Sequence, residues 1–156
     1  MSTSKERVLM REKARGHEAG WLDAVELQES ADAMTGTELY AADDRIPAFK
    51  AACAKQNMLE RPVGFVCKST AGRVVRLIQP YDSNTYTEEP EQLSAQWGFK
   101  WSTDPAKALP FIALATSPYN TGECCTHNGK VWRSGQDGNV WAPGTTGVKW
   151  EEVEGS

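Results

Sequence analysis

A β-hairpin pattern occurs twice in this chain, and it constrains the fold more than any other feature. In each copy two short apolar runs flank a turn, Ala71-Gly72 in the first and Asn128-Gly129 in the second. The Asn-Gly pair is the strongest short signal for a hairpin turn. The copies align without gaps at an offset of 57 residues, and seven of thirteen positions agree in type. The matched pairs are Cys67 and Cys124, Ser69 and Thr126, Gly72 and Gly129, Arg73 and Lys130, Val74 and Val131, Arg76 and Arg133, and Gln79 and Gln136.

The order of the features that follow also repeats. The first copy continues through Tyr86 to Trp97, and the second continues through Trp141 to Trp150. The series predicts a duplicated antiparallel β module. A chance likeness between two ordinary hairpins is the alternative.

The residues before position 61 have a helical pattern. Residues 3–6 have the form of a capping box, and a second helical run covers 21–34, with Gly36 closing it. Residues 37–42 are predicted to form a short strand, and 47–58 a further helix with Asp44 as its cap. The predicted fold class is therefore α+β. We expect a helical anchoring segment over 1–60, a β module over 61–105, a linker over 106–118 and a C-terminal β module over 119–156.

Composition excludes several classes of protein. Hydrophobic residues make up 40% and charged residues 24% of the 156 residues, which is typical of a folded chain rather than a disordered one. No apolar run reaches the roughly 18 residues of a membrane span, and the first seven residues are too polar to begin a signal peptide. The net charge of −4 carries no excess of Lys and Arg, so we expect no nucleic-acid partner and no membrane insertion.

The residues that could support catalysis or metal binding are few. Only His17 and His127 could act as imidazole bases, and no phosphate loop, nucleophile elbow or dinucleotide fingerprint is present. Adjacent Cys124 and Cys125 in a strand point to opposite faces, which makes a shared metal awkward. A zinc site from Cys67, Cys124 and His127 is the weaker alternative to reduced thiols in the core. We predict a protein that is not an enzyme and holds no cofactor or metal.

The second copy resembles a known family. The segments 121–133, then Trp141-Ala142-Pro143-Gly144 and 150–153, are similar to the small chitin-binding type of carbohydrate-binding module, families five and twelve, found in bacterial chitinases and phage tail proteins. Residues 72–97 resemble the variant of this module that recurs in phage and prophage proteins. Chitin-binding members carry an aromatic pair after the turn, where this chain has residues 133–138 without an aromatic. The resemblance therefore implies a glycan-binding module without identifying chitin as the ligand.

Exposed aromatic rings beside polar side chains are the candidate binding residues, because the C–H face of a sugar packs on an aromatic ring. Trp141 fits best, in a Gly-rich loop with Gln136 and Asn139, and Tyr86 is its counterpart in the first copy. Tyr81 and Trp101 are further candidates, and Trp101 could instead pack between the modules. Packing or a subunit contact is the alternative for Trp141. We expect Trp97, Trp132 and Trp150 to lie largely in the core.

Together these features predict a non-catalytic phage virion protein, in the tail or as a capsid accessory, assembled in the host cytoplasm. Its β modules would bind host surface glycan, and its partners would be that polysaccharide and other virion proteins. We expect a homo-oligomer, and the helical segment permits a trimer. The alternative is a purely structural virion component whose modules mediate subunit packing. An accessory module of a secreted chitinase is a third hypothesis, weakened by the missing signal and catalytic domain.

Overall fold

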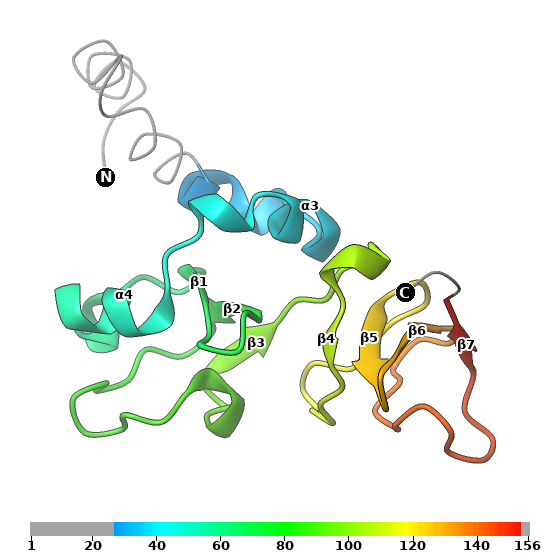
Figure 1. Cartoon of the computed structure of the whole chain (residues 1–156). Helices are drawn as coiled ribbons and strands as arrows, with labels where there is room; N and C mark the ends of the chain where they lie inside the picture. Colours follow the sequence, from blue (N-terminus) through cyan, green and yellow to red (C-terminus); the bar gives the residue numbers. More distant parts are fainter. Residues whose placement is uncertain (1–26, 154–156) are drawn as a thin grey trace, which may run out of the picture.

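The protein combines short helices with two small sheets, as the α+β prediction requires (Figure 1). The computed structural model describes residues 27–153, so the predicted capping box at 3–6 and the first six residues of the predicted 21–34 helix lie outside the described residues. Residues 27–30 of that predicted helix are helical, and a 3-10 turn follows them. Within 27–153, no helix has the length and apolar character needed to cross a bilayer.

The first sheet has the order β1-β2-β3 and the second the order β4-β5-β6-β7. The strands are β1 (Val66–Lys68), β2 (Val74–Leu77), β3 (Trp97–Phe99), β4 (Leu109–Pro110), β5 (Cys124–His127), β6 (Lys130–Ser134) and β7 (Trp150–Glu152). The helices are α3 (Gly36–Ala41) and α4 (Phe49–Lys55), with 3-10 turns η1 (Ala31–Ala33), η2 (Asp43–Arg45), η3 (Met58–Glu60), η4 (Pro90–Gln92) and η5 (Pro105–Lys107).

The two predicted hairpins are confirmed, and each is extended by a third strand that begins with the closing tryptophan. Trp97 pairs with Leu77, and Trp150 pairs with Ser134, which is the residue 57 positions after Leu77. The backbone hydrogen bonds recur in the same way. The N–H of Ile78 donates to the carbonyl of Gln96, and the N–H of Gly135 donates to the carbonyl of Lys149, each at 2.8 Å. The two donor residues, Ile78 and Gly135, are also 57 positions apart. The structure thus supports the predicted duplication at the level of individual hydrogen bonds.

The first strands of the two hairpins match at an offset of 58, not 57. The first turn has three residues between Ser69 and Arg73, whereas Asn128 and Gly129, both with positive φ, form a two-residue turn. Consequently Cys67 lies opposite Val75, and its counterpart opposite Trp132 is Cys125. The predicted equivalence of Cys67 with Cys124 is therefore wrong by one residue, because a gap-free alignment cannot see a change of turn length.

The repeat begins earlier than the hairpins. η2 and η5 are both three-residue 3-10 turns, and each is followed by a segment that makes a parallel β pair with the first strand of its hairpin. Phe49 and Phe111 come next at matching positions, and each lies edge-on to the closing tryptophan of its module. We call residues 43–100 the first module and residues 105–153 the second module.

The parallel β4–β5 pair corrects the expectation of purely antiparallel modules. It also places part of the predicted linker, 106–118, in a sheet, while Leu114 and Ser117 from the same segment are buried. Tertiary pairing stabilises this segment, and its own short apolar run could not show that.

The helical region departs from prediction at two places. Residues 37–41 of the predicted strand, 37–42, belong to α3, and Ala42 is its C-cap. Thr35 and Glu38 form a reciprocal capping box around the first turn of this helix. Gly36 therefore begins a helix rather than closing one. A side-chain carbon on Gly36 would overlap the carbonyl oxygen of Trp101, so glycine allows this helix to approach the chain between the modules.

The predicted helix over 47–58 is shorter and begins later. Pro47 accepts a hydrogen bond from the Lys68 amide, and Ala48 makes the bridge to β1, so α4 starts at Phe49 with Ala48 rather than Asp44 at its N-cap. Its C-terminal end is set by Gln56, which has extended backbone angles. Asn57 then caps η3 through its side chain.

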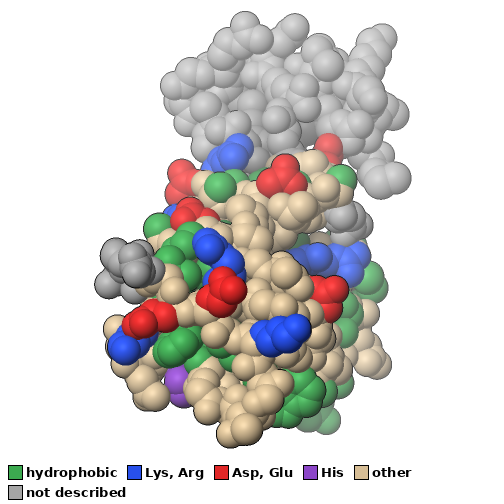
Figure 2. All heavy atoms as spheres, turned by 90° about the vertical axis from the view of Figure 1, so that its right-hand side faces the viewer, with side chains coloured by type: hydrophobic (Ala, Val, Ile, Leu, Met, Phe, Trp, Pro, Cys, Tyr) green, Lys and Arg blue, Asp and Glu red, His purple; other side chains and the backbone are tan. Residues whose placement is uncertain are grey.

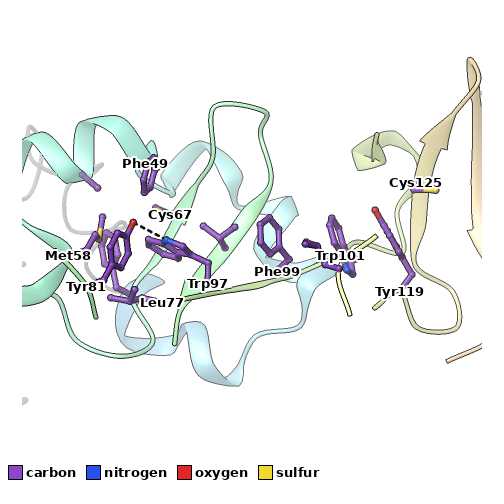
Figure 3. Close-up of a cluster of buried hydrophobic side chains, with 14 residues drawn as sticks. Phe49, Met58, Cys67, Leu77, Tyr81, Trp97, Phe99, Trp101, Tyr119 and Cys125 are labelled. Carbon is purple, nitrogen blue, oxygen red and sulfur yellow. Dashed lines mark hydrogen bonds between the residues drawn. The ribbon is translucent and has the colours of Figure 1, made fainter. Parts of the chain in front are cut away.

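One apolar cluster runs through both modules. Figure 3 shows its row of side chains, from Met58, Tyr81 and Trp97 beside the first sheet to Tyr119 and Cys125 beside the second. Trp101 joins the two halves: its ring stacks on Phe99 at 5.9 Å and on Tyr119 at 4.3 Å between centroids. A second cluster, on the other face of the first sheet, packs α3 and the preceding helical residues against Val66 and Val74.

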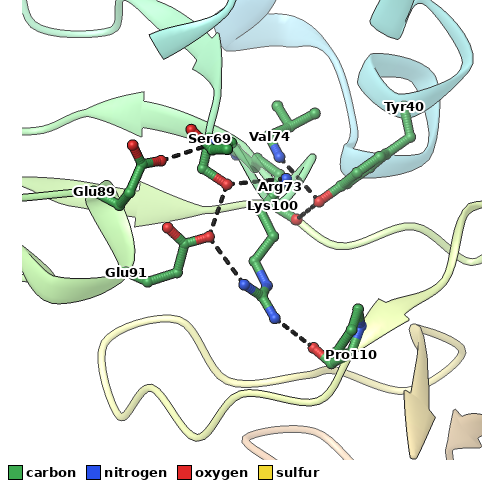
Figure 4. Close-up of polar contacts among 9 residues, drawn as sticks. Tyr40, Ser69, Arg73, Val74, Glu89, Glu91, Lys100 and Pro110 are labelled. Carbon is green, nitrogen blue, oxygen red and sulfur yellow. Dashed lines mark hydrogen bonds and ion pairs between the residues drawn. The ribbon is translucent and has the colours of Figure 1, made fainter. Parts of the chain in front are cut away.

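A buried ion pair adds a polar link between the modules (Figure 4). Arg73 and Glu91 lie 2.9 Å apart with side chains only 9% and 10% exposed. Arg73 also donates to the carbonyl oxygen of Pro110 in β4, at 2.8 Å, and Ser69 donates to the same Glu91 oxygen at 2.7 Å. Because a buried charge is costly unless it is paired, this arrangement favours one orientation of β4 against the first hairpin.

Candidate functional site

Trp141 is an exposed indole on a firmly held backbone. Trp141 is 47% exposed. Its backbone N–H nevertheless donates to the Asn139 side chain at 3.2 Å, and its backbone carbonyl accepts from the Trp150 indole at 2.8 Å. It lies in the connection between β6 and β7, three residues after Gly138, which has a positive φ. Such a backbone presents the ring in a fixed position, which lowers the entropy cost of binding a ligand.

Asn139 holds this backbone and does not contact ligand, because it is fully buried. Its amide donates to the Ser134 hydroxyl at 3.1 Å, and its backbone pairs with Tyr119 in both directions. Gln136, the other predicted polar neighbour, is partly exposed, and its side-chain oxygen accepts from the Lys149 amide at 3.0 Å. The structure thus brings both residues into the loop that carries Trp141, but it gives both of them structural hydrogen bonds.

Tyr86 is 54% exposed and lies in the connection between β2 and β3. Its loop is organised by Asp82, whose carboxylate accepts from the Asn57 side chain, the Asn84 amide and the Thr85 hydroxyl. These hydrogen bonds, that of Asn57 first, lower the pKa of Asp82. Asp137 performs a similar task in the other loop, where the Thr121 amide donates to it and lowers its pKa.

Tyr86 and Trp141 are not equivalent residues of the two modules. The carboxylate of Asp82 accepts from the amide of Asn84, and the side chain of Asn139, 57 residues after Asp82, accepts from the amide of Trp141. The position that corresponds to Trp141 is therefore Asn84, and the predicted pairing of Tyr86 with Trp141 is displaced by two residues. Each module exposes one aromatic ring from the same connection, but at different points along it.

Tyr81 and Trp101, the remaining predicted binding residues, are buried. Tyr81 is 7% exposed, and its hydroxyl accepts from the Trp97 indole at 3.0 Å. Trp101 is 4% exposed and donates to the Ser117 carbonyl at 2.9 Å, so of its two predicted roles the structure favours packing between modules. Neither ring is available to a ligand in this arrangement.

All four cysteines are free of disulfide bonds in residues 27–153, and three of the four are buried. Burial raises the pKa of Cys125 to about 12 and also raises that of Cys67, so neither thiol is a nucleophile near neutral pH. Cys125 faces the common core while Cys124 contacts the carbonyl oxygens of Thr103 and Gly122, as alternation along a strand predicts. Over residues 27–153, no group of three metal-ligating side chains comes together.

The sequence did not predict a partly exposed aromatic face on the second module. Trp132 and Trp150, expected to lie largely in the core, are only partly buried, as are Phe111 and His127 beside them. Figure 2 looks onto this side of the molecule and shows the histidine beside hydrophobic side chains. The signal that could have revealed this face is the bulk of Trp132, which occupies the position of Val75 in the first module.

The chain matches no model of a known protein family, and comparison with curated proteins and with solved structures finds no similar protein.

Proposed function

We propose that this protein is a non-catalytic, glycan-binding virion component, and that Trp141 is its principal contact residue. The observation that carries the proposal is the fixed backbone of Trp141 beneath a ring that stays 47% exposed. A ligand that covers the exposed half of the ring would gain hydrophobic stabilisation without first having to order the loop, which supports a binding role.

The ligand class follows from the chemistry of the loop. An indole face packs against the C–H groups of a sugar ring, and the exposed Asp137, Thr145 and Lys149 in the same connection offer groups for its hydroxyls. Tyr86 adds a second, separate contact on the first module. Each contact alone is weak, so useful affinity would require several contacts on one polysaccharide. The virion context rests on the resemblance to phage-borne carbohydrate-binding modules.

The test is a pull-down of the purified protein on insoluble glycans and bacterial cell walls, beside the single and double variants Trp141→Ala and Tyr86→Ala. We expect Trp141→Ala to lose most of the bound fraction and the double variant to lose the rest. Val63→Ala, which truncates a 57% exposed side chain elsewhere on the first module, is the matched control and should bind normally. Wild-type binding that the double variant retains would refute the assigned site, and no binding to any glycan would refute the function.

The structural alternative has its own supporting observation. Val63 and Ile78 are 57% and 40% exposed, and they flank the hydrogen bond from the Gly64 amide to the Leu77 carbonyl. Two exposed apolar side chains at neighbouring positions are a candidate subunit contact. If this surface mediates packing, Val63→Asp with Ile78→Asp should lower the oligomeric state measured by sedimentation while glycan binding is unchanged.

A further inference from the structure

The outer edges of β1, β3 and β4 are each covered by a different device. In β1 the backbone N–H and C=O of Val66 both bond to the Gln28 side chain. In β3 the outward-facing amide donates to the Ser117 hydroxyl at 2.9 Å. In β4 the outward-facing residue is Pro110, which has no N–H and whose carbonyl accepts from Arg73. These edges therefore offer no free backbone groups to another strand.

The outer edge of β7 is open. The amide of Val153 and the carbonyl of Lys149 bond to residues of β6 and the turn after it, so by alternation the backbone groups of Trp150 and Glu152 face away from the sheet. Within residues 27–153 these four groups have no hydrogen-bond partner. Figure 1 shows β7 at the margin of the molecule, with β6 on its inner side. Such an edge is a template for a strand from another chain.

The residues Lys149-Trp150-Glu151 along this edge are self-complementary in an antiparallel pair. Side chains alternate along a strand, so Lys149 and Glu151 lie on one face and Trp150 on the other. If Trp150 of one molecule lies opposite Trp150 of a second molecule, each Lys149 lies opposite a Glu151. Both charged side chains are exposed, and in residues 27–153 neither has an ion-pair partner. Figure 2 looks onto this side of the molecule and shows charged side chains of both signs.

The other antiparallel registers of the same edge are unfavourable. A pair centred on Glu151 would place two carboxylates directly opposite each other, with Cβ atoms about 5 Å apart. A pair centred on Glu152 would do the same with a carboxylate that already forms an ion pair with Lys130 at 3.2 Å. The charges of β7 therefore select one register, and they select a second molecule of this protein as the strand that fits it.

We propose that β7 pairs with β7 of a second molecule, antiparallel and centred on Trp150. The two Trp150 residues exchange two backbone hydrogen bonds. Two Lys149–Glu151 pairs form on one face of the extended sheet, and the exposed edges of the two indoles meet on the other. The contact is small and exposed ion pairs contribute little, so we expect a weak dimer that salt weakens further.

This dimer does not depend on the proposed glycan function, and its surface is separate from Val63 and Ile78. One consequence does rest on that function. Because the Trp150 indole donates to the Trp141 carbonyl, pairing through Trp150 places the Trp141 loops of both molecules beside the same two-fold axis. Two weak glycan contacts would then act together on one polysaccharide.

Sedimentation velocity over a range of concentrations measures the self-association of the intact chain. We expect Lys149→Glu and Glu151→Lys each to weaken it about tenfold, because each places like charges opposite each other at two symmetric positions. The double variant should associate like wild type, since both opposite-charge pairs are restored with their members exchanged. An equimolar mixture of the two single variants should recover association as well. A pair centred on Glu151 predicts neither recovery.

Both positions are exposed, and recovery in the mixture shows that the single variants are folded. Val63→Ala is the matched control and should associate like wild type, and NMR should show that the Trp150 amide becomes protected as wild type associates. The proposal is overturned if wild type stays monomeric, if neither the double variant nor the mixture associates more strongly than the single variants, or if the Trp150 amide is unchanged on association. Trp141→Ala should lose glycan binding and keep the dimer, which separates the two proposals.

Discussion

Asn139 shows how a buried polar residue can determine the position of an exposed one. Its side chain connects the Ser134 hydroxyl to the amide of Trp141, and it has no contact with solvent. The exposed ring therefore depends on a residue that no ligand touches. Positioning residues of this kind are as necessary to a binding site as the residues at its surface.

Replacing Asn139 with alanine should destabilise the fold and loosen the Trp141 loop. The change removes the shorter of the two hydrogen bonds that the buried Ser134 hydroxyl accepts and leaves the Trp141 amide without an acceptor, which we expect to lower the free energy of unfolding by about 1–3 kcal/mol. Urea unfolding measures the loss, and NMR relaxation of the Trp141 indole measures its mobility. Asn139→Asp keeps the acceptor for Trp141 and should hold the ring better than Asn139→Ala. Equal mobility in wild type and Asn139→Ala would contradict the assigned role.

Acid should loosen both aromatic loops before it unfolds the core. The pKa values of Asp82 and Asp137 are lowered by hydrogen bonds that exist only in the folded loops. Their stabilisation is therefore complete above the unfolded value of about 3.9 and is lost as the pH falls through the lower folded values. The protection factors of the Asn84 and Thr121 amides, which compare their exchange with that of an unfolded chain at the same pH, should fall below about pH 4, ahead of those in β2 and β6. Asp82→Asn should remove the pH dependence at Asn84 only, and an unchanged profile there would count against this explanation.

At the scale of single residues, the sequence predicted correctly that Trp141 is exposed, but it did not predict which of its neighbours could contact a ligand. The glycine-rich surroundings of Trp141 correctly indicated an exposed ring. The same surroundings gave Asn139 the appearance of a ligand-binding residue, because an asparagine in a loop has the same local sequence whether its amide faces water or the core. Only the pairing of Asn139 with Tyr119, twenty residues earlier, distinguishes the two.

Gln28 illustrates how an edge strand is protected at the scale of elements. Its side-chain amide donates to the carbonyl of Val66 at 2.6 Å and accepts from the amide of the same residue at 2.9 Å. It therefore makes the two hydrogen bonds that a neighbouring strand would make. In the second module β4 occupies the corresponding edge beside β5. Unpaired strand edges invite association with other chains, so both modules have their first strand covered.

Substituting Gln28 with alanine should expose the edge of β1. We expect a loss of about 1–3 kcal/mol in unfolding free energy, since two backbone groups of a buried residue lose their partners. Hydrogen exchange of the Val66 amide should accelerate at the same time. Gln28→Glu retains an acceptor for that amide and should protect it more than alanine does. If the Val66 amide stays equally protected in Gln28→Ala, another group covers this edge.

The elements that the sequence predicted correctly are those with local signals. The Asn128-Gly129 pair specifies a two-residue turn by itself, and the hairpin around it follows. The region 35–48 was misread because its signals are shared: Thr35 to Glu38 caps a helix, whereas the Leu39-Tyr40 pair after it also suits a strand. Packing of Leu39 and Tyr40 against the outer face of the first sheet decides the outcome, and that sheet lies far along the chain.

At the scale of the whole molecule, Trp101 makes the two modules one folding unit. Its stack between Phe99 and Tyr119 leaves no break in the apolar cluster. Trp101→Ala should therefore lower the unfolding free energy by about 3–5 kcal/mol and separate one cooperative transition into two. Calorimetry beside far-ultraviolet circular dichroism measures both effects. Trp141→Ala, an exposed substitution, is the control, and a Trp101→Ala variant that keeps a single transition would show that other contacts couple the modules.

The continuity of this core could not be read from the sequence. The predicted linker, 106–118, was the segment left between the two β modules, and its position along the chain does not report which segments meet in space. Leu114 and Ser117 were assigned to a connecting segment, although Leu114 belongs to a short apolar run over 109–115, because that run has no hairpin partner next to it in the sequence. Their burial depends on Phe99 and Trp101, whose positions follow from the register of the preceding sheet.

The register of the third strands also limits how such a chain could be lengthened by further duplication. In the first module Phe99 lies opposite Val75 and stacks on Trp101. In the second module the corresponding position is Glu152, which lies opposite Trp132, the counterpart of Val75. A third copy added after Val153 would therefore meet the carboxylate of Glu152, whereas the second copy meets the aromatic ring of Phe99 at the matching position. In engineering terms, a longer array of these modules would first require an aromatic residue at position 152.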